Sequence, residues 1–284
     1  MLIFFQTYKH DVLSKNRCLY FTLSKANDNM NLERYFQLYQ LSLVSFDIPT
    51  SFVIIYTFQS LYNTLHSVRS IWRNADAITF DVDSTVVQEE GIDELAKFCG
   101  KENDVIALTN RAMQGDLTYR QSLVERLNII KPSFMQIKQF LTSHPLKLSP
   151  GIKTLITALQ IREKQVFLIS GGFRSLITPI ATCLNIPLEN VFANRLKFYY
   201  TGEYAGFDED QPTAKNGGKA KIIEQLKNEK GFTTVVHIGD GATDLETISV
   251  VELFIGYGGN VIRESVKQQS LWYTTDFNEL VNIL

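Results

Sequence analysis

The chain has 284 residues, 45% of them apolar, which is enough to bury the core of an α/β domain together with a smaller inserted domain. Its net charge of −2 gives no sign of the positively charged surface that nucleic-acid binding requires. The three cysteines, Cys18, Cys99 and Cys183, are odd in number and lack C-x-x-C spacing, so neither a disulfide framework nor a zinc site is expected. A reducing compartment, and hence the cytoplasm, fits this cysteine usage best.

Residues 1–69 form an N-terminal extension rich in Phe, Tyr, Leu and Ser that matches none of the motifs described below. Asp47 and Pro49 interrupt its most apolar stretch, so a stable membrane span is not expected. Its start lacks the pattern of a secretory signal. Three interpretations remain open: a poorly ordered appendage, a targeting or membrane-associating extension, and translated sequence that is absent from the mature protein. A helix over 61–73 is a candidate for the first element that packs on the core.

The first β-type run ends in F-D-V-D-S-T, where Asp81 and Asp83 stand two positions apart. On extended backbone such residues point the same way, so the two carboxylates can share one ligand and one cation. Open parallel sheets bind ligands at the carboxyl ends of their strands, where this pair falls. Bound Mg²⁺ would offset the repulsion between the carboxylates, and such a pair suits phosphoryl transfer. On these letters alone, a solvated turn is the alternative interpretation.

The segment 92–148 reads as several amphipathic helices, which predicts a small helical domain inserted into the core. After it, Q-V-F-L-I-S-G-G is a compact apolar strand that ends in a hydroxyl and two glycines. Ser170 can donate to a phosphate oxygen, and Gly171 and Gly172 let backbone N–H groups approach it closely. An ordinary strand-to-loop turn is the alternative interpretation of this fragment.

Two features follow that strand. Residues 191–207 alternate in polarity around a Thr-Gly turn, which predicts a β-hairpin appended to the sheet. In the fragment N-G-G-K, Lys219 stands at the start of a helix, where a cation opposes the helix dipole unless an anion is bound. This unfavourable placement is a reason to suspect that Lys219 is functional.

The last informative fragment is H-I-G-D-G-A-T-D. Asp240 follows another apolar strand and can complete an oxygen site of the kind that Mg²⁺ accepts. Thr243 and Asp244 lie on the helix that follows, where the alternative for Asp244 is a first-turn acid that complements the helix dipole. His237 is expected to be a satisfied core histidine. With the strands near 77–81, 165–170, 234–239 and 252–256, the pattern predicts an α/β fold with a Rossmann-like, mostly parallel sheet.

The order of these four fragments resembles the haloacid dehalogenase superfamily of aspartyl-phosphate phosphatases. Longer stretches, such as V-V-Q-E-E-G-I-D-E-L-A, L-I-S-G-G-F-R-S and V-F-A-N-R-L-K-F-Y, are similar to the phosphoserine phosphatases of the eukaryotic type. The resemblance covers roughly residue 70 to the end of the chain. It implies a haloacid dehalogenase-type core at 70–91 and 149–284, a helical cap at 92–148, and Mg²⁺-dependent hydrolysis of O-phospho-L-serine to L-serine and phosphate, the last step of serine biosynthesis.

The resemblance also implies a role for each motif residue. Asp81 would be the nucleophile that forms the aspartyl-phosphate, and Asp83 would be the general acid and base. Mg²⁺ would be held by the Asp81 carboxylate, the Asp83 backbone carbonyl and Asp240, with Asp244 in support. The phosphate would be bound by the remaining motif residues, which are Ser170, Gly171, Gly172, Lys219 and Thr243.

Substrate selection is expected from the cap. By resemblance Glu90 would take the substrate ammonium, Arg126 would pair with its carboxylate, and Met113 would be an apolar wall. Without the family, Arg126 would be a solvated helix-face arginine and Met113 ordinary helix core. Two positions depart from the family pattern: Gln114 stands where glycine is common, and Tyr119 where phenylalanine is usual. Gln114, beside the pocket, is expected to contact the substrate carboxylate or to narrow the entrance.

Other functions stay open at this stage. The same chemistry could act on another small phosphomonoester, and a regulator could keep the fold and bind phosphate without turnover; the presence of Asp83 favours turnover. A nicotinamide dinucleotide-binding domain is disfavoured because no G-x-G-x-x-G follows the first strand. The expected partner is a small-molecule substrate, and a homodimer is suggested because family members are often dimers.

Overall fold

The computed structural model describes residue 64 and residues 66–113 and 118–284. The interpretations of the N-terminal extension therefore concern residues that lie almost wholly outside the described ranges, and so does Gln114. Within those ranges, none of the helices combines the length and the apolar character that crossing a bilayer requires.

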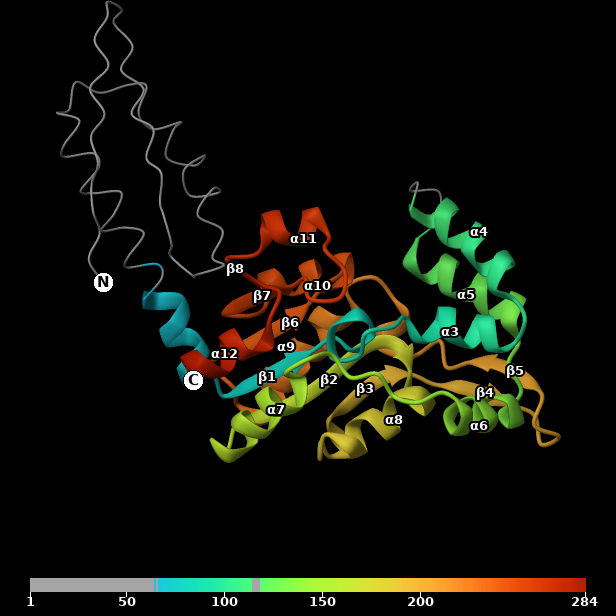
Figure 1. The fold of residues 1–284 in the computed structure, drawn as a ribbon, viewed down its shortest axis with the longest axis horizontal. Coiled ribbons are helices and arrows are strands. Elements are labelled where there is room, and N and C mark those ends of the chain that lie inside the picture. The colour runs from blue at the N-terminus through green and yellow to red at the C-terminus, as the bar shows by residue number, and fades with distance from the viewer. Residues whose placement is uncertain (1–63, 65, 114–117) are drawn as a thin grey trace, which may run out of the picture.

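Six strands form the central sheet, in the order β3-β2-β1-β6-β7-β8, and every neighbouring pair is parallel (Figure 1). The strands are β1 (Ala77–Phe80), β2 (Gln165–Phe173), β3 (Val191–Asn194), β6 (Val235–Gly239), β7 (Leu253–Tyr257) and β8 (Trp272–Thr274). β1 is central, with Phe80 in register with Leu168 on one side and Ile238 on the other. The predicted α/β fold with a Rossmann-like sheet is confirmed.

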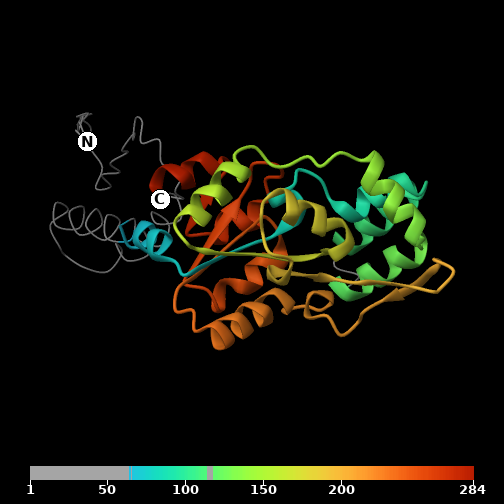
Figure 2. The ribbon, with the colours of Figure 1, turned by 90° about the horizontal axis from the view of Figure 1, so that it is seen from below.

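Helices cover both faces of this sheet. The core helices are α7 (Ile152–Ile161), α8 (Arg174–Cys183), α9 (Gly218–Lys230), α10 (Ala242–Leu245), α11 (Glu264–Gln269) and α12 (Phe277–Ile283). Ile78 and Phe80 point to the face that α7, α8 and α12 cover, whereas Ala77 packs with α9 on the other face. Figure 2 shows α7 and α9 on opposite sides of the strands. The strands are apolar on both faces because neither face meets water.

A helix at 66–74 precedes β1 and packs on the core. Trp72 is fully buried, its Nε1 donates to the Leu280 carbonyl at 3.1 Å, and its ring lies edge-on to Trp272. Val68 is also buried in the main core cluster. The described part of the predicted 61–73 helix therefore belongs to the core, which already includes residues a little before position 70.

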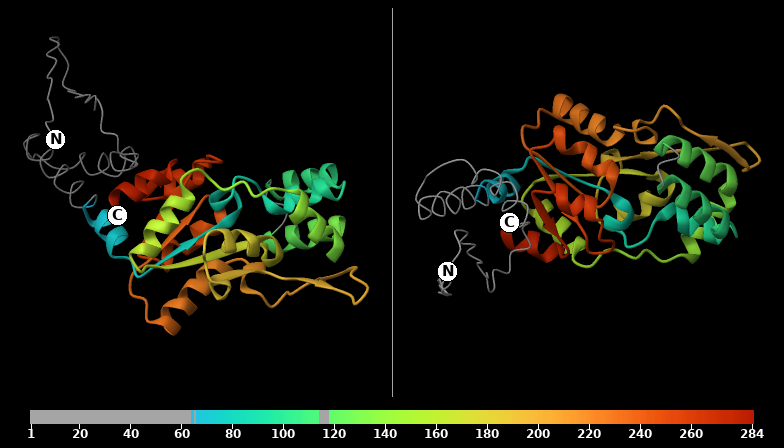
Figure 3. Two further views of the ribbon diagram at one scale, coloured as in Figure 1. Left: turned by 60° about the horizontal axis from the view of Figure 1, so that its bottom comes forward. Right: turned by 90° about the horizontal axis from the view of Figure 1, so that it is seen from above.

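Of the α-helices described between β1 and β2, four form a separate layer at the carboxyl edge of the sheet (Figure 3). They are α3 (Gly91–Phe98), α4 (Glu102–Met113), α5 (Tyr119–Ile130) and α6 (Phe134–Ser143). Thr118 and Ser133 begin α5 and α6 with capping boxes. Leu95 and Leu127 belong to an apolar cluster that also includes Phe173 of β2, so this helical cap has a core of its own that rests on the sheet domain.

Two short linkers join the cap to the core and run side by side. Val87 forms an antiparallel bridge with Leu148, and the Gln88 N–H donates to the Lys147 carbonyl at 2.9 Å. The chain therefore leaves the core and returns to it at one place, which is the geometry of a hinge.

The hairpin predicted at 191–207 is only partly correct. Residues 191–194 form β3, an edge strand of the main sheet, because their apolar side chains are buried against α8 and β2. The hairpin itself consists of β4 (Leu196–Phe198) and β5 (Tyr204–Phe207), which form a separate antiparallel pair. It extends along the cap, where Phe198 meets Phe134 at the start of α6 with ring centroids 5.6 Å apart (Figure 3).

Candidate active site

Three adjacent strands bring the predicted acidic and hydroxyl residues to one edge of the sheet. Asp81 follows β1 directly, Ser170 lies near the end of β2, and Asp240 follows β6. All three are buried. Asp83 lies in the turn Val82–Val86, in which Ser84 takes a left-handed conformation with φ of 53°. The strand-end rule thus correctly predicted that these separated fragments would meet.

Lys219 places a positive charge between two carboxylates of this site. Its Nζ lies 2.8 Å from Asp81 Oδ1 and 2.6 Å from Asp244 Oδ1, and the side chain is buried. Burial alone would lower the pKa of Lys219, but Asp244 and Asp81 raise it above its ordinary value. A buried, permanently charged ammonium beside the expected nucleophile resolves the oddity of a lysine at the start of α9.

Asp244 is buried, and hydrogen bonds from the protein interior fix its carboxylate. His237 Nε2 lies 2.8 Å from Asp244 Oδ1, and the other ring nitrogen lies 2.8 Å from Thr79 Oγ1. The Gly241 N–H donates to Asp244 Oδ2 at 2.9 Å. His237 is thus the satisfied core histidine that was expected, but it also orients Asp244, which in turn orients Lys219. Burial tends to raise the pKa of Asp244, yet Lys219 and His237 together hold it below its ordinary value.

The three other aspartates, Asp81, Asp83 and Asp240, have raised pKa values. Burial and then Asp244 raise the pKa of Asp81 well above its ordinary value. Burial and the nearby Glu90 raise the pKa of Asp83 to about 6, and burial and Asp244 raise that of Asp240 to about 6. Carboxyl oxygens of Asp81, Asp240 and Asp244 lie within 4.8 Å of one another. This acidic cluster can hold a metal ion, which would relieve the repulsion that raises these pKa values.

The Asp83 carboxylate contacts the start of the cap and is not one of the three acids of that cluster. Its Oδ1 accepts a hydrogen bond from the Gly91 N–H at 2.7 Å, and its Oδ2 accepts one from Ser170 Oγ at 3.1 Å. Gly91 is the first residue of α3, so the Asp83 side chain binds the first backbone N–H of this helix. Gly172 lies close by, and a Cβ built on it would come within 2.8 Å of Asp83 Oδ2. The Asp83 carboxylate therefore lies at the interface between cap and core and contacts both.

Arg263 is a site residue that the sequence analysis missed. Its Nε lies 3.0 Å from Asp240 Oδ2 and its Nη2 lies 3.3 Å from Glu90 Oε1. Glu90 Oε1 also accepts a hydrogen bond from Ser84 Oγ at 2.8 Å. Arg263 lies in the loop after β7, the neighbour of β6, so its position after a strand end was the signal that could have found it.

The remaining predicted residues are only partly placed. Thr243 lies on α10, next to Asp244 and partly buried. Arg126 donates from Nε and Nη2 to Ser122 Oγ, at 3.1 and 2.9 Å, within its own helix. Met113 is the last residue of α4, but its side chain, like the whole of Gln114, lies outside the described part of the chain. The roles expected for these cap residues thus stay predictions.

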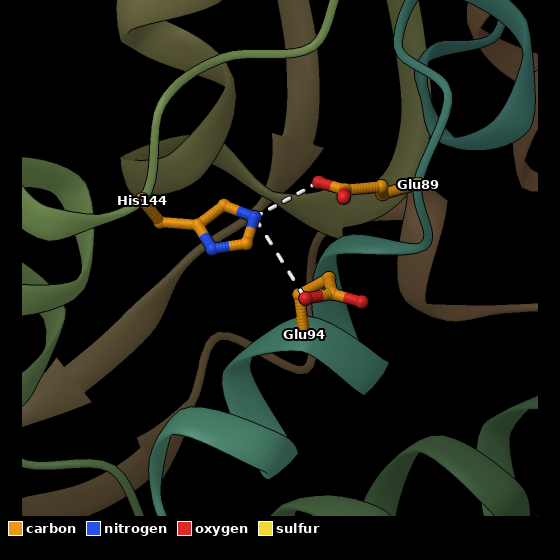
Figure 4. Close-up of side chains that lie close together, drawn as sticks. All are labelled: Glu89, Glu94 and His144. Atoms are coloured by element: carbon orange, nitrogen blue, oxygen red, sulfur yellow. Dashed lines mark hydrogen bonds and ion pairs between the residues drawn. The ribbon is translucent and has the colours of Figure 1, made fainter.

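The hinge beside the site carries its own ion pairs. Glu89, in the outgoing linker, binds Lys147 and lies 2.8 Å from His144 Nε2, both at the returning linker. Figure 4 shows Glu89 and Glu94 pointing at the same ring nitrogen of His144, with Glu94 at 3.8 Å. The His144 ring stacks on Phe140 of α6, with centroids 4.7 Å apart. Side chains as well as backbone therefore hold the two linkers together.

A parallel sheet with an acidic, lysine-containing site at its carboxyl edge and a helical cap above it defines a class of phosphoryl-transfer hydrolases. A family model described as haloacid dehalogenase-like hydrolase matches residues 75–251. The phosphoserine phosphatase of Bos taurus is 56% identical over 217 residues, which cover 76% of this chain and 96% of that protein. The enzyme of Drosophila melanogaster is 47% identical over 210 residues, 74% of this chain and 78% of that protein.

Similar solved structures indicate the same family. A phosphoserine phosphohydrolase-like protein from Francisella tularensis has a TM-score of 0.62 at 31% identity and covers 74% of this chain and 99% of its own. A substrate-bound phosphoserine phosphatase has a TM-score of 0.65 at 26% identity, with coverage of 74% and 99%. The chain belongs to the phosphoserine phosphatase family of haloacid dehalogenase-like hydrolases, and the predicted family is confirmed.

Proposed function

We propose that this chain hydrolyses O-phospho-L-serine to L-serine and phosphate through an aspartyl-phosphate on Asp81, the last step of serine biosynthesis. The observation that supports it most directly is the contact of Asp81 with Lys219, with Asp83 within reach of the same site. Family membership supports the substrate, because the curated relatives at 47–56% identity are phosphoserine phosphatases.

Asp81 would attack phosphorus with one carboxylate oxygen. Its Oδ1 already accepts hydrogen bonds from Lys219 Nζ and from the Val82 N–H, the latter at 2.7 Å, which fixes the orientation of the carboxylate. A carboxylate is a weak nucleophile, so positioning and charge neutralisation must supply most of the rate enhancement. Lys219 provides a fixed positive charge next to the incoming phosphate, at no cost in reorganisation.

Asp83 would protonate the departing serine oxygen and then take a proton from the water that hydrolyses the aspartyl-phosphate. A pKa of about 6 suits both roles, because the carboxyl gives up and regains a proton near neutral pH. Splitting the hydrolysis into two displacements lets one residue serve both steps. Asp83 also accepts a hydrogen bond from the N–H of Gly91, which begins α3 and adjoins the cap, so closure of the cap would hold this carboxyl in place.

The donor set of the acidic cluster fits Mg²⁺, because it consists of oxygen atoms only and carries an excess of negative charge. We propose the Asp81 carboxylate, the Asp83 backbone carbonyl and Asp240 as ligands. Asp244 is engaged by Lys219 and His237 and would support the site without ligating. When bound, Mg²⁺ would neutralise charge on the phosphoryl group in transfer.

The phosphate would be held by Ser170, by the N–H groups of Gly171 and Gly172, and by Lys219 and Thr243. The amino acid part of the substrate would be selected by cap-side residues, with Glu90 binding the ammonium and Arg126 the carboxylate, beside Met113 and Gln114.

We propose that residues 92–148 act as a cap that closes over the core at 70–91 and 149–284, with residues 1–69 as an extension. We further propose a cytoplasmic enzyme, acting on a small molecule and able to form a homodimer.

The test is phosphate release by the full chain from O-phospho-L-serine, O-phosphothreonine, a sugar phosphate and an unspecific aryl phosphate, with and without Mg²⁺. Turnover that needs Mg²⁺, prefers phosphoserine, is abolished by Asp81→Asn and is unchanged by the exposed control Asp104→Asn would establish the proposal. If the chain prefers another phosphomonoester, the proposed substrate is wrong and that compound takes its place. Absence of turnover from a folded, Mg²⁺-binding chain would favour a phosphate-binding regulator.

A further inference from the structure

Tyr119, on the cap, makes a hydrogen bond to the core inside the site. It is the first residue of α5, and its hydroxyl donates to the carbonyl oxygen of Gly171 at 3.1 Å. The capping box of Thr118 and Gln121 fixes the backbone at this point, so the phenol is presented from a rigid position. The side chain is partly buried, and burial raises the pKa of the phenol, which therefore stays a donor at all physiological pH values.

The same carbonyl accepts a second hydrogen bond from within the core. Asn194 Nδ2, at the end of β3, lies 2.7 Å from the Gly171 oxygen. Asn194 is itself held, because its Oδ1 accepts from Thr213 Oγ1 at 2.8 Å. The Gly171 carbonyl thus has two donors, one on each side of the cap and core interface, and both of its lone pairs have a partner.

This carbonyl belongs to the peptide unit that also carries the Gly172 N–H. The unit is planar, so donors that fix the carbonyl direction also fix the opposite direction of the N–H. The Gly172 N–H donates to Ser170 Oγ at 2.8 Å, and Ser170 Oγ donates to Asp83 Oδ2 at 3.1 Å. A continuous set of hydrogen bonds therefore runs from the Tyr119 phenol through one peptide group to the expected acid. Chains of this kind polarise one another, so a donor at the carbonyl makes the N–H a stronger donor.

The fit between Tyr119 and Gly171 is close. A Cβ built on Gly171 would lie 1.9 Å from the Tyr119 oxygen, so the phenol fills the space that any side chain at 171 would need. Close approach of the hydroxyl to the peptide thus requires glycine at this position.

We propose that Tyr119 is a positioning residue that couples closure of the cap to the phosphate site, by orienting and polarising the Gly171–Gly172 peptide, whose N–H donates to Ser170 Oγ beside Asp83. This inference rests on the proposed function for its kinetic consequences. It predicts an effect on every phosphomonoester that the site accepts, because the peptide orients Ser170 and, through it, Asp83, to which the proposed function gives roles at the phosphate and the departing oxygen and not at the amino acid part of the substrate.

Tyr119→Phe is the variant that tests it, because the ring and its packing remain and only the donor is lost. One net hydrogen bond contributes about 0.5–1.5 kcal/mol, which corresponds to a change of about 2–10-fold. We expect kcat/KM for O-phosphoserine and for the aryl phosphate to fall by the same factor within that range, and inhibition by inorganic phosphate to weaken to a similar extent. Tyr204→Phe, on the hairpin, is the matched control and should change neither. An unchanged Tyr119→Phe enzyme, or a loss confined to phosphoserine, would overturn the proposal.

A second readout does not depend on turnover. The chain contains three Gly-Gly pairs, 171–172, 217–218 and 258–259. Labelling glycine with ¹³C at the carbonyl and ¹⁵N at the amide makes a carbonyl-to-amide correlation spectrum show only the second residue of each pair. We expect the Gly172 amide proton to move upfield in Tyr119→Phe, with smaller changes at Gly218 and Gly259. If phosphoserine were not hydrolysed but this signal moved, only the proposed function would fail; a Gly172 signal that stays in place would overturn the coupling itself.

Discussion

The guanidinium of Arg263 lies 3.3 Å from the carboxylate of Glu90, which joins the loop after β7 to the linker that enters the cap. The same guanidinium is bonded to Asp240, so one side chain orients both an expected metal ligand and the expected acceptor of the substrate ammonium. Burial would lower the pKa of Arg263, but Asp240 and Glu90 outweigh it and raise the pKa, so its charge is permanent.

Arg263→Gln should therefore weaken phosphoserine binding. Loss of hydrogen bonds to charged groups costs about 1.5–3 kcal/mol, so KM for phosphoserine should rise about tenfold or more. KM for an aryl phosphate should change less, because that substrate has no ammonium for Glu90 to bind. Steady-state kinetics at saturating Mg²⁺ measures both, and Arg195→Gln, which removes the same charge at an exposed position, is the control. Equal losses on both substrates would show that Arg263 acts through Asp240 alone.

Asp83→Asn should stabilise the metal-free protein at neutral pH. The pKa of Asp83 is raised from 3.8 to about 6, so the folded state holds this proton more tightly than the unfolded chain does. The stabilisation that the proton supplies is complete below pH 3.8 and is lost as the pH rises through about 6. Above that pH the charged carboxylate destabilises the fold by on the order of 2 kcal/mol, after allowance for solvent screening.

Urea unfolding in the presence of a chelator, between pH 4.5 and 7.5, measures this effect. The free energy of unfolding of Asp83→Asn should exceed that of the parent at pH 7.5 and approach it at the acid end. Asp104→Asn, at an exposed position of α4, should follow the parent throughout. A constant difference between Asp83→Asn and the parent across the range would contradict the raised pKa.

Much of the site was predictable because it is local in sequence. Asp81 and Asp240 each follow a short apolar strand directly, and parallel strands end at one edge, so their convergence needed no knowledge of packing. Lys219 was recognisable as an unfavourable charge at a helix start. The direction of the Asp83 carboxylate was not predictable, because it depends on how the cap helix α3 docks on the core.

The missed contacts are those between distant loops. Arg263 meets Glu90 across 173 positions, and Tyr119 meets Gly171 across 52, and no periodicity encodes such pairings. The hairpin range was too wide for a similar reason: residues 191–194 alternate like a hairpin strand, and only their burial against β2 assigns them to the sheet. Composition and pattern specify elements, whereas these pairings follow from the assembled fold.

Lys219→Met should strongly destabilise the protein. The substitution leaves Asp81 and Asp244 buried without their cation, and breaking a buried ion pair from one side typically costs about 3–5 kcal/mol. The loss should be smallest at acid pH, where Asp81 takes up a proton, since burial raises its pKa well above the ordinary value. Thermal and urea unfolding measure it, with Lys221→Met, an exposed lysine of the same helix, as the control. A loss below about 1 kcal/mol, the range of surface pairs, would contradict a buried ion pair.

Glu89→Gln should loosen the hinge without unfolding the cap. Glu89 binds Lys147 and His144 across the two linkers, and although burial tends to raise its pKa, these two partners hold it below its ordinary value. Its contribution to stability is therefore present above pH 4.5 and is lost as the pH falls through the lowered pKa. Because the pairs are partly exposed, the global loss should stay within about 1 kcal/mol, and high salt should mimic part of it. Amide hydrogen exchange should accelerate in residues 87–90 and 144–148 but not within α5, while the exposed control Glu102→Gln leaves exchange unchanged. If exchange in both linkers were the same in Glu89→Gln as in the parent, the backbone bridge between Val87 and Leu148 would suffice to hold the hinge, and the charged side chains would contribute nothing to it.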